Sequence, residues 1–201
     1  MKNFLIAVIV VTGVVALVFA QNDAEKKGNV VKDKSGNLYP LKIMLDGNRW
    51  VTQNLNSKLT GAYCYEDKEV NCSQYGRLYS WEAAKQACHM MGDGWRLPTS
   101  DEWQEMAKHY GGVHDDSGNT GKAAYQALLA DGNAEFKALL GGGRDSDGKY
   151  ARLNAHGFYW SATERNTVAA EFFNFGKGSQ ALYRQSEGEK SRAFSVRCIK
   201  P

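Results

Sequence analysis

The sequence predicts an α+β fold in one domain, with two main helices in the first half and antiparallel strands filling the C-terminal part. Alternating or ring-rich segments typical of strands occur near both ends, at residues 37–55 and 157–200. Between residues 80 and 110, apolar residues recur at helical spacing instead. Because strands at both ends enclose the helices, we expect the terminal strands to meet in one sheet.

The composition excludes several broad classes of protein. Of the 201 residues, 43% are hydrophobic and 23% are charged, which is typical of a globular chain and not of a disordered tail. The 25 basic and 22 acidic residues are scattered together, so the net charge of +3 forms no basic stripe. We therefore expect no nucleic-acid partner.

The N-terminus has the pattern of an export signal. Lys2 precedes an uncharged run over residues 4–20, which ends in Val-Phe-Ala, a sequence that suits a signal peptidase. We expect a signal peptide at residues 1–20, a disordered lead at 21–29 and a folded domain at 30–201. The run is at the lower limit of the length that crosses a bilayer, so we expect no membrane span after cleavage; an uncleaved anchor is the alternative.

The first elements of the domain form a predicted hairpin. Residues 37–45 alternate as a half-buried strand, and a second strand follows at residues 49–55. Asp46 and Gly47 lie between them, and this dipeptide favours a tight turn.

Helices are predicted next. The first spans residues 80–91, with Ser80 as its expected N-cap. The second spans residues 100–110, and Thr99 and Glu102 form a capping box at its start. Rings on the apolar faces and in the segments around these helices are expected in the core: Trp81, Trp95, Trp103 and Trp160.

The second half begins with one broken helix or two short helices, at residues 122–130 and 133–140, the latter capped by Asn133. The glycine- and asparagine-rich stretch 141–157 is expected to be a loop. Four strands are predicted after it, at residues 157–164, 168–175, 181–185 and 193–200.

Four cysteines in an exported chain predict two disulfides, for which three pairings exist. No C-x-x-C motif occurs, so neither a zinc ribbon nor a thioredoxin-type site is expected.

Six segments together resemble the bacterial family called the Fibrobacter succinogenes major paralogous domain. In order they are GNLYPLKIMLDGNRWVTQNL, AYCYED, YGRLYSWEAAKQAC, GWRLPTSDEW, GFYWSATE and FSVRCIK. The resemblance implies a C-type-lectin-like fold, distantly similar to formylglycine-generating and sulfatase-modifying domains. It also implies a bacterial protein, which the export signal leads us to expect in the periplasm, on the cell surface or outside the cell.

The lectin-like resemblance implies which cysteines pair. A bridge from Cys88 to Cys198 would fasten the first helix to the last strand, as in C-type-lectin-like domains. The remaining pair, Cys64 and Cys72, would close the polar loop between them. The chain-entropy argument gives the longer bridge the larger stabilisation.

The sequence gives no catalytic constellation, so we expect no enzyme. Sulfatase-modifying relatives use a cysteine pair near the C-terminus, where this chain has only Cys198. Ser161 and Ser195 lack the G-x-S-x-G context of a nucleophile elbow. Four histidines are too far apart in sequence for a zinc pattern: His89, His109, His114 and His156.

We expect no cofactor except calcium. The sugar-binding tripeptides of C-type lectins are absent, but two acidic turns carry the oxygen ligands that calcium prefers, at residues 114–119 and 144–148. Asp145 and Asp147 in the second turn are the candidate ligands.

The expected function is that of an exported, non-enzymatic binding module for a glycan or protein ligand. In lectin-like folds the long loops around the C-terminal strands bind ligand. Rings and planar polar groups there are the candidate contacts: Arg144, Tyr150, Asn154, Glu164, Arg165, Asn166, Tyr183 and Arg184. The alternatives are a self-assembling cell-surface protein and an enzyme relative of the sulfatase-modifying type that has lost its cysteine pair.

Overall fold

The computed structural model describes residues 29–115 and 118–201. The signal peptide expected at residues 1–20 and nearly all of the lead expected at 21–29 lie outside the described residues. Residues 31–201 form one unit that combines helices with curled sheets, so the α+β prediction is confirmed.

The first sheet joins the two ends of the domain. Its strand order is β1 (Val30–Lys32), β2 (Leu38–Ile43), β3 (Arg49–Val51) and β11 (Ile199–Lys200). The predicted hairpin is confirmed, because β2 and β3 are antiparallel and Gly47 between them has the positive φ of a tight turn. β11 pairs with β3, so the terminal strands do meet in one sheet.

The second sheet has the order β10-β9-β8-β6-β7. Its strands are β6 (Gly141–Arg144), β7 (Tyr150–Leu153), β8 (His156–Glu164), β9 (Ala169–Gly176) and β10 (Ala181–Glu189). Neighbours are antiparallel except β6 and β8, which pair in parallel at Gly142 and Gly157. A two-stranded antiparallel sheet consists of β4 (Ala62–Tyr63) and β5 (Leu78–Tyr79).

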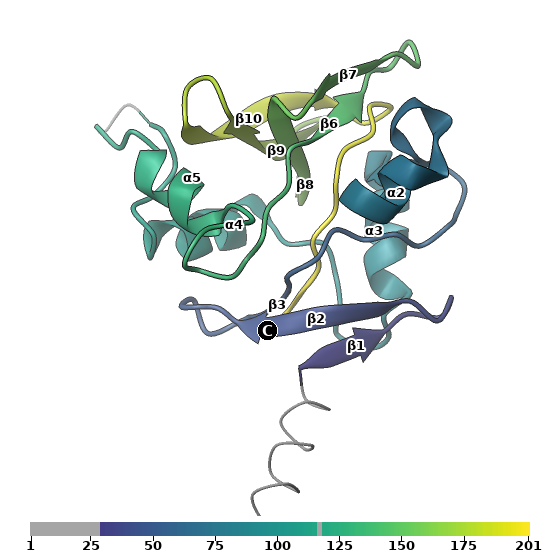
Figure 1. Ribbon diagram of the computed structural model, residues 1–201, viewed down its shortest axis with the longest axis horizontal. Coiled ribbons are helices and arrows are strands. Elements are labelled where there is room, and N and C mark those ends of the chain that lie inside the picture. Colours follow the sequence, from purple (N-terminus) through teal and green to yellow (C-terminus); the bar gives the residue numbers. More distant parts are fainter. Residues whose placement is uncertain (1–28, 116–117) are drawn as a thin grey trace, which may run out of the picture. The chain divides into compact units, whose positions relative to one another are not determined.

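Helices α4 (Ser100–Lys108) and α5 (Lys122–Leu128) lie on one side of the five-stranded sheet, and α2 (Glu69–Tyr75) and α3 (Trp81–His89) on the other (Figure 1). The capping box of Thr99 and Glu102 is confirmed at the start of α4. Ser80 is the N-cap residue of α3, but its side chain makes no capping hydrogen bond.

The helix predicted at residues 133–140 is wrong. Glu135 and Lys137 have φ values of 56° and 58°, which no α-helix permits. The carbonyl groups of Phe136 and Lys137 are turned instead to the buried Arg197, which donates to them at 2.7 and 2.6 Å. A distant guanidinium therefore overrides the local helical pattern.

The loop predicted at residues 141–157 is also wrong, because β6, β7 and the start of β8 occupy ten of its seventeen residues. Glycines occupy the first three of the four residues of β6, and two of them have no room for a side chain. A Cβ atom on Gly142 would lie 2.6 Å from the carbonyl oxygen of Ala151. The same argument holds for Gly143, whose Cβ would meet the rings of Phe158 and Phe194 at 3.1 Å.

Two further predictions are corrected in part. Of the strand expected at 193–200, only β11 is regular, and the rest makes isolated bridges that include Phe194 to Tyr79. The polar segment between Cys64 and Cys72 is not an open loop, because it contains the 3₁₀-helix η1 (Tyr65–Asp67) and the start of α2.

The five-stranded sheet separates two apolar clusters. Alternation along β8 sends Phe158 and Trp160 into the cluster with α3, and Tyr159 into the cluster with α4 and α5. The tryptophans predicted to be core residues are all buried: Trp81, Trp95, Trp103 and Trp160.

Both predicted disulfides are confirmed, Cys88 with Cys198 and Cys64 with Cys72.

Candidate functional site

A cleft of about 480 Å³ opens between the β6–β7 hairpin and the neighbouring face of β8 and β9. This cleft is lined by Gly143, Asp145, Ser146, Asp147, Ala151, Arg152, Phe158, Phe172, Arg192 and Phe194. The volume lies in the range of pockets that hold small molecules.

The floor of the cleft is aromatic. Phe158 on β8 and Phe172 on β9 point to the same face of the sheet, and Phe194 comes from the segment before β11. The ring centroid of Phe158 lies 6.0 Å from that of Phe172 and 5.1 Å from that of Phe194. These rings remain 8%, 8% and 3% exposed, so their edges reach the cleft while most of each ring belongs to the core.

Arg152 stands at the rim and is exposed. Its guanidinium carbon lies 5.9 Å from the ring centroid of Phe158. Its φ of 69° is in the left-handed region, where an arginine is rare. Among residues 29–115 and 118–201, no carboxylate lies within ion-pair distance of this guanidinium.

The acidic residues of the rim face cations. Asp147 accepts from Lys149 Nζ at 2.7 Å, and this hydrogen bond lowers the pKa of the Asp147 carboxyl. Asp145 lies 3.7 Å from Arg192. The carboxylates of this rim are thus engaged by neighbouring charges.

A strip of polar groups and rings continues from the cleft across the sheet. His156 Nδ1 lies 2.9 Å from Asn174 Oδ1, and the His156 ring stacks beside Phe158 at 5.4 Å. Asn174 is paired across the strands with Tyr183, whose ring stacks on His114 at 4.8 Å. We call His114, Tyr183, Asn174 and His156 the sheet-face strip.

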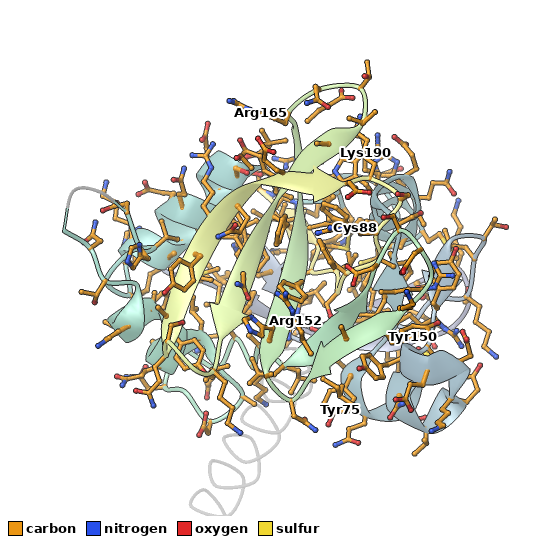
Figure 2. The ribbon with its side chains drawn as sticks, turned by 90° about the horizontal axis from the view of Figure 1, so that it is seen from above. Tyr75, Cys88, Tyr150, Arg152, Arg165 and Lys190 are labelled. Carbon is orange, nitrogen blue, oxygen red and sulfur yellow. A yellow bond between two sulfur atoms is a disulfide. The ribbon has the colours of Figure 1, made fainter. Side chains whose placement is uncertain are left out.

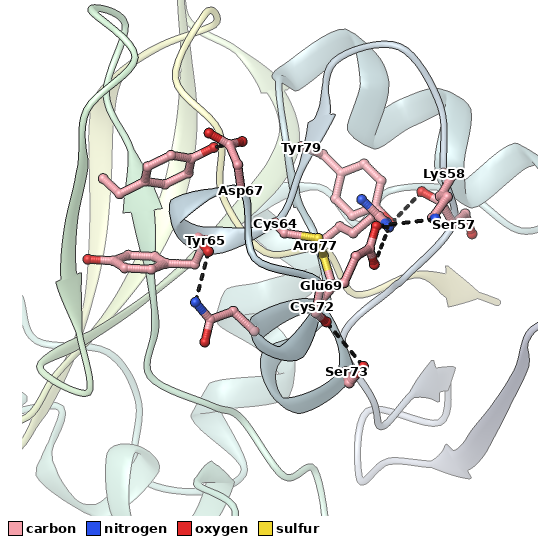
Figure 3. Close-up of a disulfide and its surroundings, with 12 residues drawn as sticks. Ser57, Lys58, Cys64, Tyr65, Asp67, Glu69, Cys72, Ser73, Arg77 and Tyr79 are labelled. Atoms are coloured by element: carbon pink, nitrogen blue, oxygen red, sulfur yellow. Dashed lines mark hydrogen bonds and ion pairs between the residues drawn. A yellow bond between two sulfur atoms is a disulfide. The ribbon is translucent and has the colours of Figure 1, made fainter.

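The β6–β7 hairpin forms one wall of the cleft. The segment closed by Cys64 and Cys72 packs against the side of this hairpin that faces away from the cleft. The Tyr150 hydroxyl donates to Asp67 Oδ1 at 2.6 Å, and its ring lies 5.2 Å from Tyr65. Burial, followed by this contact with Asp67, raises the pKa of Tyr150 to about 12. In Figure 3, Tyr65 and Asp67 lie on the side of the disulfide away from Glu69 and Arg77.

The predicted ligand residues do not form a single site. Figure 2 shows Arg165 at one end of the five-stranded sheet and Arg152 and Tyr150 toward the other. Glu164 and Asn166 belong with Arg165, since all three lie at the β8–β9 turn.

Several of the predicted residues are engaged within the domain. Glu164 pairs with Lys190, and Asn166 Oδ1 accepts from the backbone at Val168 and Ala169. Arg184 is bound to the buried Glu171 at 2.8 Å.

The other predicted residues divide between the hairpin contacts outside the cleft, the strip and the cleft itself. Arg144 lies with its guanidinium carbon 4.2 Å from the Tyr63 ring, on the hairpin that also carries Tyr150. Asn154 accepts a hydrogen bond from Tyr75 at 2.8 Å, beyond the end of β7. Tyr183 lies in the strip, and Asp145 and Asp147 line the cleft.

The described residues contain one group with the spacing of a metal site, Cys64, Glu69 and Cys72. Both of its sulfur atoms are bonded to each other in the disulfide, so neither is available as a thiolate ligand. Calcium at Asp145 and Asp147 stays a prediction, for which the ammonium of Lys149 would have to leave Asp147.

Reasoning from the sequence missed Arg152, His156, Phe158 and Asn174. His156 and Asn174 are eighteen residues apart and meet through the antiparallel pairing of β8 and β9. The strand predicted at residues 157–164 begins one residue too late to include His156. Begun at His156, as β8 does, its alternation places His156 and Phe158 on one face.

Comparison with known proteins identifies the family. No curated protein and no solved structure matches the chain significantly. The family described as the Fibrobacter succinogenes major domain matches residues 34–200. Because this match covers most of the sequence, the chain belongs to the Fibrobacter succinogenes major domain family.

Proposed function

We propose that the protein is an exported, non-enzymatic binding module with a C-type-lectin-like fold, and that it binds a glycan in the cleft. The observation that carries this proposal is the aromatic floor of Phe158, Phe172 and Phe194 beneath a charged rim. Ring edges offer area to the apolar face of a sugar, while rim and strip side chains offer directed hydrogen bonds to hydroxyl groups.

The size of the cleft supports a glycan ligand. Its volume of about 480 Å³ lies in the range of pockets that hold small molecules, and it suits a few sugar units.

The bonding of the cysteines supports a non-enzymatic role and export. Both pairs are disulfides, so no free thiol pair supports oxidase chemistry of the sulfatase-modifying type. Disulfides persist in oxidising compartments outside the cytosol. Within residues 29–115 and 118–201, no helix has the length and apolar character to cross a bilayer.

One observation favours the self-assembling alternative. Leu38, Ile43 and Leu45 on or next to β2 are 62%, 62% and 63% exposed. Sedimentation of residues 21–201 separates the two functions, since a surface polymer would form concentration-dependent assemblies and a binding module would stay one size.

The cleft can be tested with a matched pair of ring deletions. Phe158→Leu removes a floor ring, whereas Phe175→Leu removes a buried ring of the opposite cluster that does not line the cleft. Each should cost about 1 to 2 kcal/mol of stability. On a glycan array, with and without a calcium chelator, we expect Phe158→Leu to lose about tenfold in affinity and Phe175→Leu to bind like the parent chain.

Thermal unfolding of both variants serves as the control for folding. Equal binding by the two variants, or retention of a protein partner with silence on every glycan, would contradict the proposed function.

A further inference from the structure

We infer that the glycan bound in the cleft is acidic, and that the carboxylate of one sugar unit pairs with Arg152. This inference rests on the proposed function and names its ligand class. It depends on three features of the rim: the backbone of Arg152, the distribution of charge, and the position of the guanidinium over the floor.

The backbone of Arg152 is held in an unfavourable conformation. Residues with a side chain rarely adopt a φ of 69°, and a folded protein keeps such a conformation only where its surroundings fix it. Here Ala151 and Leu153 on either side are fixed by pairing with Gly143 and Gly141 of β6. The strand register therefore fixes the position from which the exposed guanidinium extends beside the cleft.

The charges at the rim leave Arg152 without a counterion. Asp147 faces Lys149, and Asp145 and Glu189 face Arg192. Arg152 faces no carboxylate within the described part of the chain. The named charges of the rim sum to zero, three carboxylates against three cations, so the rim has no excess positive charge. What it offers an anionic ligand is the guanidinium of Arg152, whose donors have no carboxylate partner among the described residues.

The guanidinium also lies where a sugar substituent would reach it. With its carbon 5.9 Å from the Phe158 centroid, it stands over the edge of the aromatic floor. A sugar whose apolar face contacts Phe158 would direct ring substituents toward the rim. A carboxylate there meets the planar fork of arginine, which binds both carboxylate oxygens at once.

The test compares two ligands that have the same sugar chain and differ in whether the carboxyl groups are charged or methylated. Oligogalacturonate carries a carboxylate on every unit, and its methyl ester has the same chain without the charge. By calorimetry on residues 21–201 at low salt, we expect the acid to bind about tenfold more tightly than the ester, as a charge-assisted hydrogen-bonded pair predicts. The preference should shrink as salt is raised, because the rim is exposed.

Variants of Arg152 test whether this residue causes the preference for the acid over the ester. Arg152→Gly suits the positive φ and should bind acid and ester equally, while Arg152→Lys keeps the charge without the fork and should show a reduced preference. Arg49→Ala removes an exposed arginine from β3 in the other sheet and should keep the full preference. Circular dichroism checks that each variant is folded.

The outcomes separate the inference from the proposed function. Equal binding of acid and ester by the parent chain, or an undiminished preference in Arg152→Gly, overturns the acidic ligand and leaves glycan binding standing. If neither oligomer nor any neutral glycan binds, both proposals fail.

Discussion

Arg197 shows how one residue can set the course of a distant segment. Its side chain is fully buried, and the same burial lowers the pKa of its guanidinium. It donates to the carbonyls of Phe136 and Lys137 and to Asn54 Oδ1 at 2.7 Å, with the Phe136 ring 4.8 Å away. No buried carboxylate is among these partners, so carbonyl dipoles and rings compensate the charge.

Tyr150 links the hairpin wall to the disulfide-closed segment, and its hydroxyl can be tested directly. Tyr150→Phe removes the hydrogen bond to Asp67 and should lower the free energy of unfolding by about 1 kcal/mol at neutral pH. Denaturant unfolding measures the loss.

The same variant predicts a pH dependence. The pKa of Tyr150 is raised to about 12 in the folded chain, above the value of about 10 in an unfolded chain. The unfolded chain therefore releases this proton first, and the stability from Tyr150 is complete below about pH 10 and lost as the pH rises toward 12. The gap between parent and Tyr150→Phe should close over that window; a constant gap from pH 9 to 12 would show that Asp67 does not hold the hydroxyl.

At the scale of elements, the segment closed by Cys64 and Cys72 supports the cleft from behind. Tyr65 and Asp67 contact Tyr150 on β7, and Tyr75 at the end of α2 reaches Asn154. The Tyr65 ring also leaves no room for a side chain on Gly142 of β6. One short disulfide loop thus fixes both strands of the hairpin.

Removing that disulfide should loosen the hairpin selectively. The double variant Cys64→Ala, Cys72→Ala should lose about 2.5 kcal/mol, as the closure of an eight-residue loop predicts. Hydrogen exchange should accelerate in β6 and β7 and stay slow in β9 and β10, which serve as the internal reference. Equal acceleration in all these strands would mean that the loop stabilises the domain without positioning the hairpin.

The sequence predicted the elements whose conformation depends on residues nearby in the chain. It did not predict those whose conformation depends on contacts with residues far away in the chain. The hairpin at Gly47 and the capping box of Thr99 and Glu102 depend on neighbours in sequence. The segment 133–140 depends on Arg197, about sixty residues away. β6 depends on rings and carbonyls that crowd its glycines, which a glycine-rich stretch does not reveal.

For the molecule as a whole, the fold places the candidate site away from most of the residues predicted for it. The disulfide pairing followed correctly from the resemblance, and Cys88 to Cys198 ties α3 to the segment that carries Phe194. The C-terminal turns, however, are partly engaged in internal contacts such as Glu164 with Lys190. The cleft, with the exposed Arg152 at its edge, lies instead on the sheet face beside the hairpin.

The central claim is that ligand binds in the cleft between the β6–β7 hairpin and β8–β9. Chemical-shift mapping of isotope-labelled residues 21–201 during titration with oligogalacturonate tests it most directly. The account predicts shifts at Arg152, Phe158 and Phe172, extending to Asn174, with none at the β8–β9 turn. Shifts confined to Arg165 and Asn166 in that turn, with no change at the residues of the cleft, would contradict it.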